Sequence, residues 1–519
     1  MRYWLYQYKR TWRGSITTSF LYPVLYLAAM GVGLGSLVKH PVGGEARYLD
    51  FLAPGLLAST AMQIGGNEAM YPVMAAIKWL RTYFAMLATP LTVIDVLVGH
   101  LAWIAVRLVM VTSIYLAIMA AFGTVHSAWA ILALPVGVLT GMAFAAPIAA
   151  FAATQQHDTG FSTIYRLGLI PLFLFSGTFF PIALLPGWLQ TDRPGDAALP
   201  RCGALPRPGA RPHRPDTCRR TPRLPARAHR RRLRAGPGHV PAEARHVTGR
   251  TTSGGQSLRI APVALFGTRR ARRLVERNIM VYRRGWVYFV SGFFEPFFYL
   301  LSIGVGLGKL VGTIHVGHQL IPYTSYVAPG LLASSAMNGA TIDSTFNVFF
   351  KLKIAKTYDA VLSTPLGPGD IALGELAWSL MRATIYSASF LVVMAGLGYV
   401  LSPWAILLLP AAMSISFAFS AVGMAGTTYM RSWQDFDKVS LALIPLFLFS
   451  ATFYPLTVYP GWLQAVVRCT PLYQGVVLLR GLDTGIVSWS LAGHFVYLIV
   501  AGLLGLIVAT KRMAALLLP

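Results

Sequence analysis

The sequence predicts an all-α, polytopic integral membrane protein that contains the same helical module twice. Apolar residues make up 55% of its 519 residues, charged residues only 12%, and the mean hydropathy is +0.57. Water-soluble proteins carry roughly 25% charged residues, so a single aqueous domain is excluded. Charges are scarce within several apolar runs of about 20 residues, the length that an α-helix needs to cross a bilayer.

The net charge of +26 does not by itself indicate a nucleic-acid-binding protein. Fifteen of the 44 basic residues, all arginine, lie between residues 191 and 250, in a stretch that contains no aromatic residue to stack on bases. The other basic residues lie mostly in short clusters beside apolar runs, where cytoplasmic loops are rich in Lys and Arg. We therefore expect a lipid bilayer, and no nucleic acid, as the partner of these clusters.

An internal repeat defines the organisation of the chain. FLAPGLLASTAM at residues 51–62 recurs as YVAPGLLASSAM at residues 326–337, and TPLTVIDVLVGHLAW from residue 89 recurs as TPLGPGDIALGELAW from residue 364. IPLFLFSGTFFPIALLPGWLQ from residue 170 recurs as IPLFLFSATFYPLTVYPGWLQ from residue 444. Collinear matches over roughly 170 residues indicate two homologous modules. We place them at residues 1–190 and 261–519, with residues 191–260 between them.

The first module is expected to begin with a helix in the membrane interface, because residues 1–13 are basic and aromatic. Apolar length and loop charge then predict five spans, near residues 15–38, 51–76, 98–122, 127–153 and 163–185.

The second module opens with an arginine-rich segment and has six predicted spans. These spans lie near residues 288–311, 325–349, 373–398, 402–428, 438–458 and 488–510. About eleven transmembrane helices are therefore expected, with the sixth span absent from the first module. The basic clusters place both termini, and the loops that follow the second span of each module, in the cytoplasm.

The segment at residues 191–260 departs from this pattern. Its first 60 residues hold fifteen arginines and ten prolines, which excludes a membrane span. One explanation is that a frameshift joins two genes, one for each module. Read one nucleotide later, the codons of residues 196–207 permit Thr-Pro-Leu-Tyr-His-Gly-Val-Ala-Leu-Cys-Arg, which matches TPLYQGVVLLR at residues 470–480. The alternative is a disordered basic linker. Resequencing the coding DNA distinguishes the two.

The repeated motifs resemble the ABC-2 family of bacterial ABC-transporter permeases, especially the subgroup that exports antibiotics of the daunorubicin type and lipo-oligosaccharides. The resemblance lies in the APGLL start of span two, the TPL segment after the following loop, and LFLFSGTFFP with LPGWLQ. It implies six-helix modules with a cytoplasmic coupling helix between spans two and three and short re-entrant segments before span six. It also implies export of an amphiphilic small molecule, antibiotic or lipo-oligosaccharide by alternating access.

The resemblance further implies two copies of a separate ATP-binding subunit and a location in the bacterial cell membrane. The chain itself is not expected to be an enzyme. GVGLGKL at residues 304–310 lacks the spacing and the hydroxyl of a phosphate-binding loop. The histidines show no metal-ligand spacing, so no metal or cofactor is expected in this chain. ATP and Mg²⁺ are expected on the partner subunit.

Three acidic residues are predicted within or beside membrane spans. Glu68 and Asp343 occupy equivalent places in the second spans, and an ionised carboxylate in hydrocarbon costs at least about 2.5 kcal/mol. Each therefore requires a partner or water. Two interpretations remain open. The first is a position beside a cavity or at the ATPase-facing end, and the second is an ion pair within the module or a helix cap. Glu295, which replaces Tyr22 of the first module, is either a contact to substrate or an acid near a helix start.

The loops between spans two and three are candidates for contact with the ATPase. Following the resemblance, the candidate coupling residues are Lys78, Arg81, Asp95, Lys351, Lys353, Lys356 and Asp370. Asp95 and Asp370 follow a Thr-Pro turn and are expected near the start of a new helix, where a negative charge favours the helix dipole. The alternative is an ordinary cytoplasmic loop with capping residues.

Aromatic residues gather at the outer end of span five in both modules. They are Phe179, Phe180, Trp188, Phe453, Tyr454 and Trp462. An interfacial belt is the expected role, and an exit route for an amphiphile is the alternative.

A second function class is an ion-coupled secondary transporter with parallel repeats, in which buried acids would couple ions to substrate. Collapse of the proton gradient that stops transport while ATP remains would favour it.

Overall fold

The structure is a computed structural model that describes residues 2–38, 41–45, 47–155, 159–185, 268–282, 286–316, 319–432 and 435–518. The segment at residues 191–260 lies outside the described residues. The described parts of both modules fall within one compact unit.

The described residues of the first module form helices connected by short loops. In order these are α1 (Arg2–Tyr26), η1 (Leu27–Leu34), η2 (Gly35–Leu37), α2 (Tyr48–Met74), η3 (Ala75–Trp79), α3 (Thr82–Leu87), α4 (Val93–Ala121), η4 (Ala128–Leu132), α5 (Ala133–Thr154), α6 (Thr159–Ile164), η5 (Tyr165–Leu169), α7 (Ile170–Phe175) and η6 (Ile182–Leu184).

The second module repeats this order and adds a hairpin, two short helices and a last long helix. Its elements are α8 (Thr268–Tyr282), α9 (Trp286–Ser302), η8 (Ile303–Leu307), α10 (Gly308–Val311), β1 (Thr313–Val316), β2 (Gln319–Pro322), α11 (Tyr323–Ile342), η9 (Asp343–Asn347), η10 (Phe350–Ile354), α12 (Thr357–Leu362), α13 (Pro368–Gly396), η11 (Pro403–Leu407), α14 (Leu408–Thr427), α15 (Phe436–Phe449), η13 (Leu456–Val458), α16 (Gly461–Arg468), α17 (Pro471–Thr484) and α18 (Trp489–Leu517). The strands β1 and β2 pair antiparallel.

The prediction of an all-α, multi-pass membrane protein is confirmed. Among the described residues, seven helical segments are long and apolar enough to cross a bilayer, and they lie at residues 19–37, 93–121, 128–154, 292–311, 368–396, 403–427 and 489–517. The helices α2 and α11 are as long but richer in small and polar residues, and most of their residues are buried among other helices. The total of eleven spans stays a prediction.

Two predicted boundaries are wrong at the outer end of span five. Instead of continuing to residues 185 and 458, the helices α7 and α15 end at Phe175 and Phe449. Gly177 (φ +83°) and Ala451 (φ +56°) then adopt left-handed backbone conformations, which an α-helix does not accommodate. The predicted interface helix at residues 1–13 is likewise not a separate element, because α1 is continuous from Arg2 to Tyr26.

The two modules interlock through a reciprocal contact at the outer end of span five. A Cβ on Gly306 of the second module would lie 2.1 Å from Cδ1 of Phe180, and a Cβ on Gly33 of the first module would lie 2.5 Å from Cζ of Tyr454. Gly33 and Gly306 are repeat equivalents, as are Phe180 and Tyr454. Glycine is therefore required because an aromatic ring occupies the space of its missing side chain.

This contact corrects the expected interfacial belt. The four side chains Phe179, Phe180, Phe453 and Tyr454 are buried in the core. Trp462 is 70% exposed, as an interfacial residue would be, and Trp188 lies outside the described residues. Burial of the four rings follows from the early helix ends, which turn the chain back against the neighbouring module.

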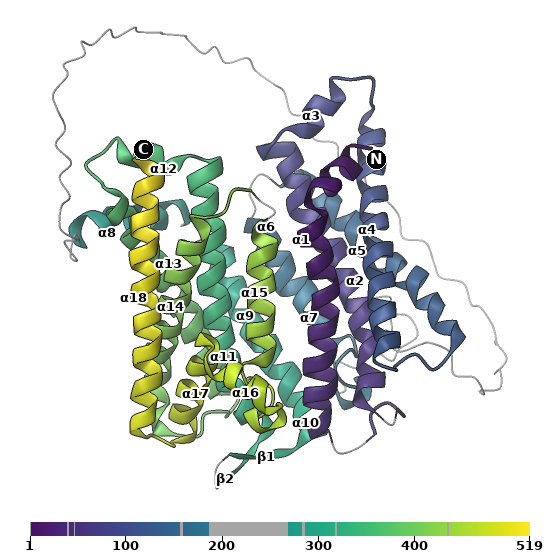
Figure 1. Ribbon diagram of the computed structural model, residues 1–519, viewed down its shortest axis with the longest axis vertical. Coiled ribbons are helices and arrows are strands. Elements are labelled where there is room, and N and C mark those ends of the chain that lie inside the picture. The colour runs from purple at the N-terminus through teal and green to yellow at the C-terminus, as the bar shows by residue number, and fades with distance from the viewer. Residues whose placement is uncertain are drawn as a thin grey trace, which may run out of the picture. The chain divides into compact units, whose positions relative to one another are not determined.

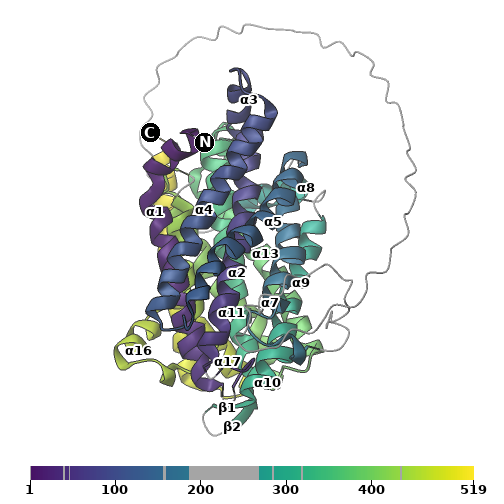
Figure 2. The same cartoon turned by 90° about the vertical axis from the view of Figure 1, so that its right-hand side faces the viewer.

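The short helices α3 and α12 mark one end of the helical array. Figure 1 shows them at the same end as the start of α1 and the end of α18, while β1 and β2 lie at the opposite end, and Figure 2 shows the same order from the side. This is the end for which the basic loops predict a cytoplasmic location, and that location stays a prediction.

Candidate functional site

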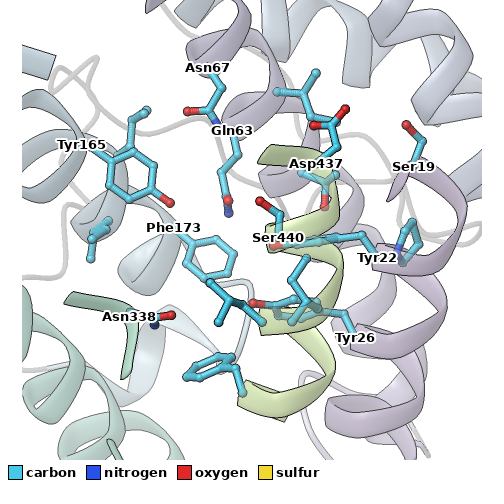
Figure 3. Close-up of a pocket in the computed structure, with 18 of the residues that line it drawn as sticks. Ser19, Tyr22, Tyr26, Gln63, Asn67, Tyr165, Phe173, Asn338, Asp437 and Ser440 are labelled. Atoms are coloured by element: carbon cyan, nitrogen blue, oxygen red, sulfur yellow. The ribbon is translucent and has the colours of Figure 1, made fainter. Parts of the chain in front are cut away.

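A cavity of about 470 Å³ lies between the two modules. Its walls come from α1, α2, α4, η5 and α7 of the first module and from α9, α11 and α15 of the second. Figure 3 shows Tyr22, Gln63, Asn338 and Ser440 around a common space. A volume of this size is in the range of sites that bind drug-sized molecules, roughly 300–1,000 Å³.

Equivalent residues of the two modules face one another across this cavity. Gln63 and Asn338, which are 275 residues apart and repeat equivalents, each contribute an amide. Phenol rings come from the equivalent pair Tyr26 and Tyr299. Apolar contacts come from three more equivalent pairs on η5 or α7 and on α15, which are Leu169 with Leu443, Ile170 with Ile444, and Phe173 with Phe447. The cavity therefore lies where the internal repeat brings matching helix faces together.

The symmetry is broken at polar positions. Glu295 lines the cavity where the first module has Tyr22, and Asn67 lines it where the second module has Ile342. Arg166 of η5, whose counterpart is Ser440, donates its Nε–H to Glu295 Oε2 at 3.1 Å. The predicted acid Glu295 is thus an ion-paired wall residue that joins the two modules.

Glu68 and Asp343 form ion pairs within their own modules, the second of the two interpretations that the sequence left open. Arg107 Nη1 lies 3.0 Å from Glu68 Oε1, and Arg382 Nη1 lies 2.6 Å from Asp343 Oδ1. The arginines are repeat equivalents on α4 and α13, so the pair has been retained in both modules. The environments differ, because the side chains of the second pair are 2% and 8% exposed and those of the first are 20% exposed.

The short helices α3 and α12 have the same local geometry. Each follows a π-helical turn, η3 or η10, and a single residue in the left-handed conformation, Arg81 (φ +53°) or Lys356 (φ +46°). Lys78, Arg81, Lys353 and Lys356 are exposed there. Two large apolar side chains are exposed beside them, Leu80 at 68% and Phe84 at 59%.

Asp95 and Asp370 lie in the first turns of α4 and α13 and cap those helices. Asp95 Oδ2 accepts from the Thr92 N–H at 2.8 Å, and Asp370 Oδ2 accepts from the Gly367 N–H at 3.0 Å. In the first module the Asp95 N–H also donates to Thr92 Oγ1, which completes a capping box. These contacts account for both aspartates without a partner protein.

The placement of Lys351 in a cytoplasmic loop is wrong. Lys351 lies in η10 and is buried, with Nζ 2.7 Å from Glu375 Oε1 on α13 and 3.3 Å from Asn278 Oδ1 on α8. Burial lowers the pKa of the Lys351 ammonium, and the Glu375 carboxylate opposes that shift. Burial and the same carboxylate raise the pKa of the Tyr358 phenol on α12. We name Asn278, Lys351, Tyr358 and Glu375 the polar cluster.

The first module replaces the polar cluster with an uncharged contact. Its counterparts of Lys351 and Glu375 are Ala76 and His100. The buried His100 contacts Tyr83 of α3 through Nδ1 and the Tyr83 hydroxyl at 3.0 Å, and its Nε2 contacts the Glu68 carbonyl at 3.3 Å. Each short helix therefore places a tyrosine, Tyr83 or Tyr358, near the following long helix, but only Tyr358 lies beside charged groups.

Sequence reasoning missed several of these residues. The repeat could have identified Gln63 and Asn338, since both are amides at equivalent positions of otherwise apolar spans. The repeat gave no signal for Arg166 or for Asp437, which also lines the cavity, because neither residue has a charged counterpart in the other module. Within the described part of the chain, no group of three or more His, Cys, Asp or Glu side chains is placed to hold a metal ion.

Helices that span a membrane, an internal repeat and a cavity on the interface between the repeats define a membrane transport protein. The family model for ABC-2 type transporters matches residues 1–191 and 270–483. The chain therefore belongs to the ABC-2 type transporter family, whose members are membrane permease components that work with separate ATP-binding subunits.

Curated relatives agree with this assignment. Nodulation protein J of Rhizobium leguminosarum bv. trifolii is 35% identical over 194 residues, which is 37% of this chain and 72% of that protein. Nodulation protein J of Sinorhizobium fredii is 30% identical over 206 residues, 39% of this chain and 77% of that protein. The probable doxorubicin resistance ABC transporter permease protein DrrC of Mycobacterium tuberculosis is 24% identical over 249 residues, 45% of this chain and 87% of that protein. No solved structure matches this chain.

Proposed function

We propose that this chain supplies both permease modules of an ABC exporter that moves an amphiphilic small molecule, antibiotic or lipo-oligosaccharide out of a bacterial cell. Two copies of a separate subunit bind ATP and Mg²⁺ and hydrolyse the ATP. The permease lies in the cell membrane with both termini in the cytoplasm. The observation that carries the proposal is the cavity between the modules, which equivalent residues of both modules line.

The lining of the cavity supports a cargo with a largely uncharged polar part. Amides and phenols predominate among its polar groups, including Gln63, Asn67, Asn338, Tyr26 and Tyr299. Two of the charged wall residues, Arg107 and Glu295, are engaged in ion pairs. Amides and phenols donate and accept hydrogen bonds, and phenol rings also offer apolar faces. Such groups suit the hydroxyls and rings of an amphiphile.

Replacing either cavity amide should reduce transport. Gln63→Leu or Asn338→Leu removes one hydrogen-bonding side chain from the wall, and one hydrogen bond is worth about 1–1.5 kcal/mol, close to a tenfold change in affinity. The measurement is ATP-driven uptake of doxorubicin into inverted membrane vesicles that contain the chain and its ATP-binding subunit. The name of the mycobacterial relative motivates this probe.

The matched control is Ser389→Leu on α13, outside the cavity, which should leave the apparent affinity for doxorubicin unchanged. An unchanged affinity in both amide variants would reject the cavity as the binding site for this probe. Doxorubicin uptake that requires no ATP would instead reject the proposed function.

The exposed surface at α3 and α12 supports docking of the ATP-binding subunits. Leu80 and Phe84 form an exposed apolar patch beside the cations Lys78 and Arg81. Exposed apolar side chains rimmed by charge are typical of protein–protein contacts. Lys353 and Lys356 lie at the corresponding place of the second module.

Reversing the charge of the four exposed cations should uncouple ATP hydrolysis from transport. The variant Lys78→Glu, Arg81→Glu, Lys353→Glu, Lys356→Glu is expected to lower ATP-driven transport at least tenfold while the vesicles retain normal amounts of the chain. The measurement is transport per ATP hydrolysed. The control is Lys309→Gln at the other end of the second module's first span, where the amide can still donate to the Leu184 carbonyl, and it should have no effect. Unchanged transport in the fourfold variant would remove these residues from the coupling surface.

The alternative, an ion-coupled secondary transporter, has less support. It requires buried acids that bind ions, whereas Glu68, Asp343 and Glu295 each pair with an arginine. A protonophore should therefore leave ATP-driven transport intact in inverted vesicles, and loss of transport at constant ATP would favour the alternative.

A further inference from the structure

One face of α5 in the first module is exposed although its counterpart in the second module is buried. Leu139 is 68% exposed and Val136 is 54% exposed, whereas their counterparts on α14, Ser414 and Ala411, are 4% and 5% exposed. The two helices share the same repeat offset of 275 residues, so the comparison is position by position.

The same face continues along α5 as a row of alanines. Ala143, Ala146 and Ala150 are exposed, and their counterparts Ala418, Ala421 and Ala425 are buried. Spacings of three and four residues place such side chains on one side of a helix. The exposed row is therefore one continuous stripe, and it corresponds to the stripe that is covered on α14.

The last helix of the chain, α18, covers the stripe on α14. The approach is close, because a Cβ on Gly505 of α18 would lie 2.8 Å from the carbonyl carbon of Ala421 and 2.7 Å from the backbone nitrogen of Val422. Gly502 of α18 similarly abuts the ring of Phe417. Small residues on both helices allow their backbones to approach, which is the usual basis of helix packing in membranes.

The helix α18 also contacts α13, so it occupies a groove between two helices. Ala372 of α13, Ala421 of α14 and Ala509 of α18 belong to one buried apolar cluster. In the first module the counterpart of Ala372 is Leu97 on α4, which is 49% exposed. The helices α4 and α5 lie at the edge of the helical array opposite α18 (Figure 1). We name the surface formed by their exposed residues the open groove; these residues are Leu97, Val136, Leu139, Ala143, Ala146 and Ala150.

We propose that the open groove binds a transmembrane helix of the α18 type, apolar with glycine and alanine on one face, which another polypeptide supplies. In the second module, the equivalent face of α14 is covered by the transmembrane helix α18. The chain's own α18 is engaged on α14, and the arginine- and proline-rich residues 191–250 have the wrong composition for a span. Read one nucleotide later, the codons of residues 196–207 permit a counterpart of the start of α17, so we take a product of that reading frame as the source of the helix.

The test is disulfide cross-linking in membranes. The full chain, with Cys202, Cys218 and Cys469 changed to serine, carries Ala146→Cys in the open groove. The co-expressed probe is the segment 461–519 with Cys469→Ser and Ala509→Cys, because Ala509 belongs to the same buried cluster as Ala421, the counterpart of Ala146 in the second module. We expect a disulfide-linked adduct of chain and probe at a yield at least tenfold above that of the controls.

Two single-cysteine controls make the test selective. Val109→Cys lies on an exposed position of α4, where only lipid is expected, and Ala421→Cys lies on the stripe that α18 already covers. Ala146→Phe should fill the open groove and abolish the adduct that Ala150→Cys otherwise gives. Equal yields at residues 146, 109 and 421 would overturn the proposal in favour of lipid alone. A disulfide between two copies of the Ala146→Cys chain, with no probe adduct, would make a second copy the occupant and would equally overturn it.

Discussion

Replacing Arg382 by methionine is expected to lower the free energy of unfolding by about 3–5 kcal/mol, because it leaves the buried Asp343 carboxylate without its cation. Arg382 Nη1 lies 2.6 Å from Asp343 Oδ1, and the two side chains are 2% and 8% exposed, so water cannot replace the lost partner. Arg382 also donates to the Tyr386 hydroxyl at 3.3 Å, a contact that methionine cannot make. The measurement is denaturant-induced unfolding of the purified chain in detergent micelles.

The equivalent change in the first module is the internal control. Arg107→Met removes the same type of pair, but the Glu68 and Arg107 side chains are 20% exposed and water can partly hydrate the remaining carboxylate. We expect a loss of about 1–2 kcal/mol, between the values for exposed and buried pairs. Equal losses for the two variants would contradict the assignment of different burial to the two pairs.

The second large effect is expected from the polar cluster. Glu375→Leu leaves the Lys351 ammonium buried with the Asn278 carbonyl oxygen at 3.3 Å as its remaining contact in the cluster. A buried charge without its counter-ion costs about 3–5 kcal/mol. We therefore expect reduced stability in detergent and reduced amounts of the chain in membranes.

The double variant Lys351→Met, Glu375→Leu separates stability from coupling. Removing both charges and keeping apolar volume should restore the free energy of unfolding to within about 1 kcal/mol of the parent chain, because neither charge is then left unpaired. Transport per ATP should still fall several-fold, since the cluster links η10, which leads directly into the short helix α12, to α8 and α13. Normal transport in the double variant would limit the cluster to a structural role.

Much of the fold follows from the repeat and from the apolar runs. A match at a fixed offset identifies equivalent residues from the sequence alone. It identifies Glu68 as the equivalent of Asp343 and Arg107 as the equivalent of Arg382. Each acid lies about forty residues from its arginine, and pairing follows because two neighbouring helices must satisfy both charges inside the module. The Thr-Pro turns likewise predicted where α4 and α13 begin, because the capping aspartates act within four residues of sequence.

Features that depend on distant or module-specific contacts could not be read from the sequence. Lys351 lies two residues from the exposed Lys353, and only the position of Glu375, 24 residues away, explains its burial. The pair of Arg166 and Glu295 joins the two modules and has no counterpart to reveal it. The early ends of α7 and α15 depend on residues with left-handed backbone conformations, Gly177 and Ala451. Hydropathy does not predict them, because a segment that turns back is as apolar as one that continues as a helix.

The left-handed residues Arg81 and Lys356, each just before a short helix, have a mechanical consequence. A residue with a side chain has only a small range of φ and ψ in this region, and holding it there costs about 1–3 kcal/mol. The joint between each short helix and the long helix before it is therefore stiff. A rotation of α3 should therefore be transmitted to α2, and a rotation of α12 to the helical segment from α11 to η10, with little bending at Arg81 or Lys356.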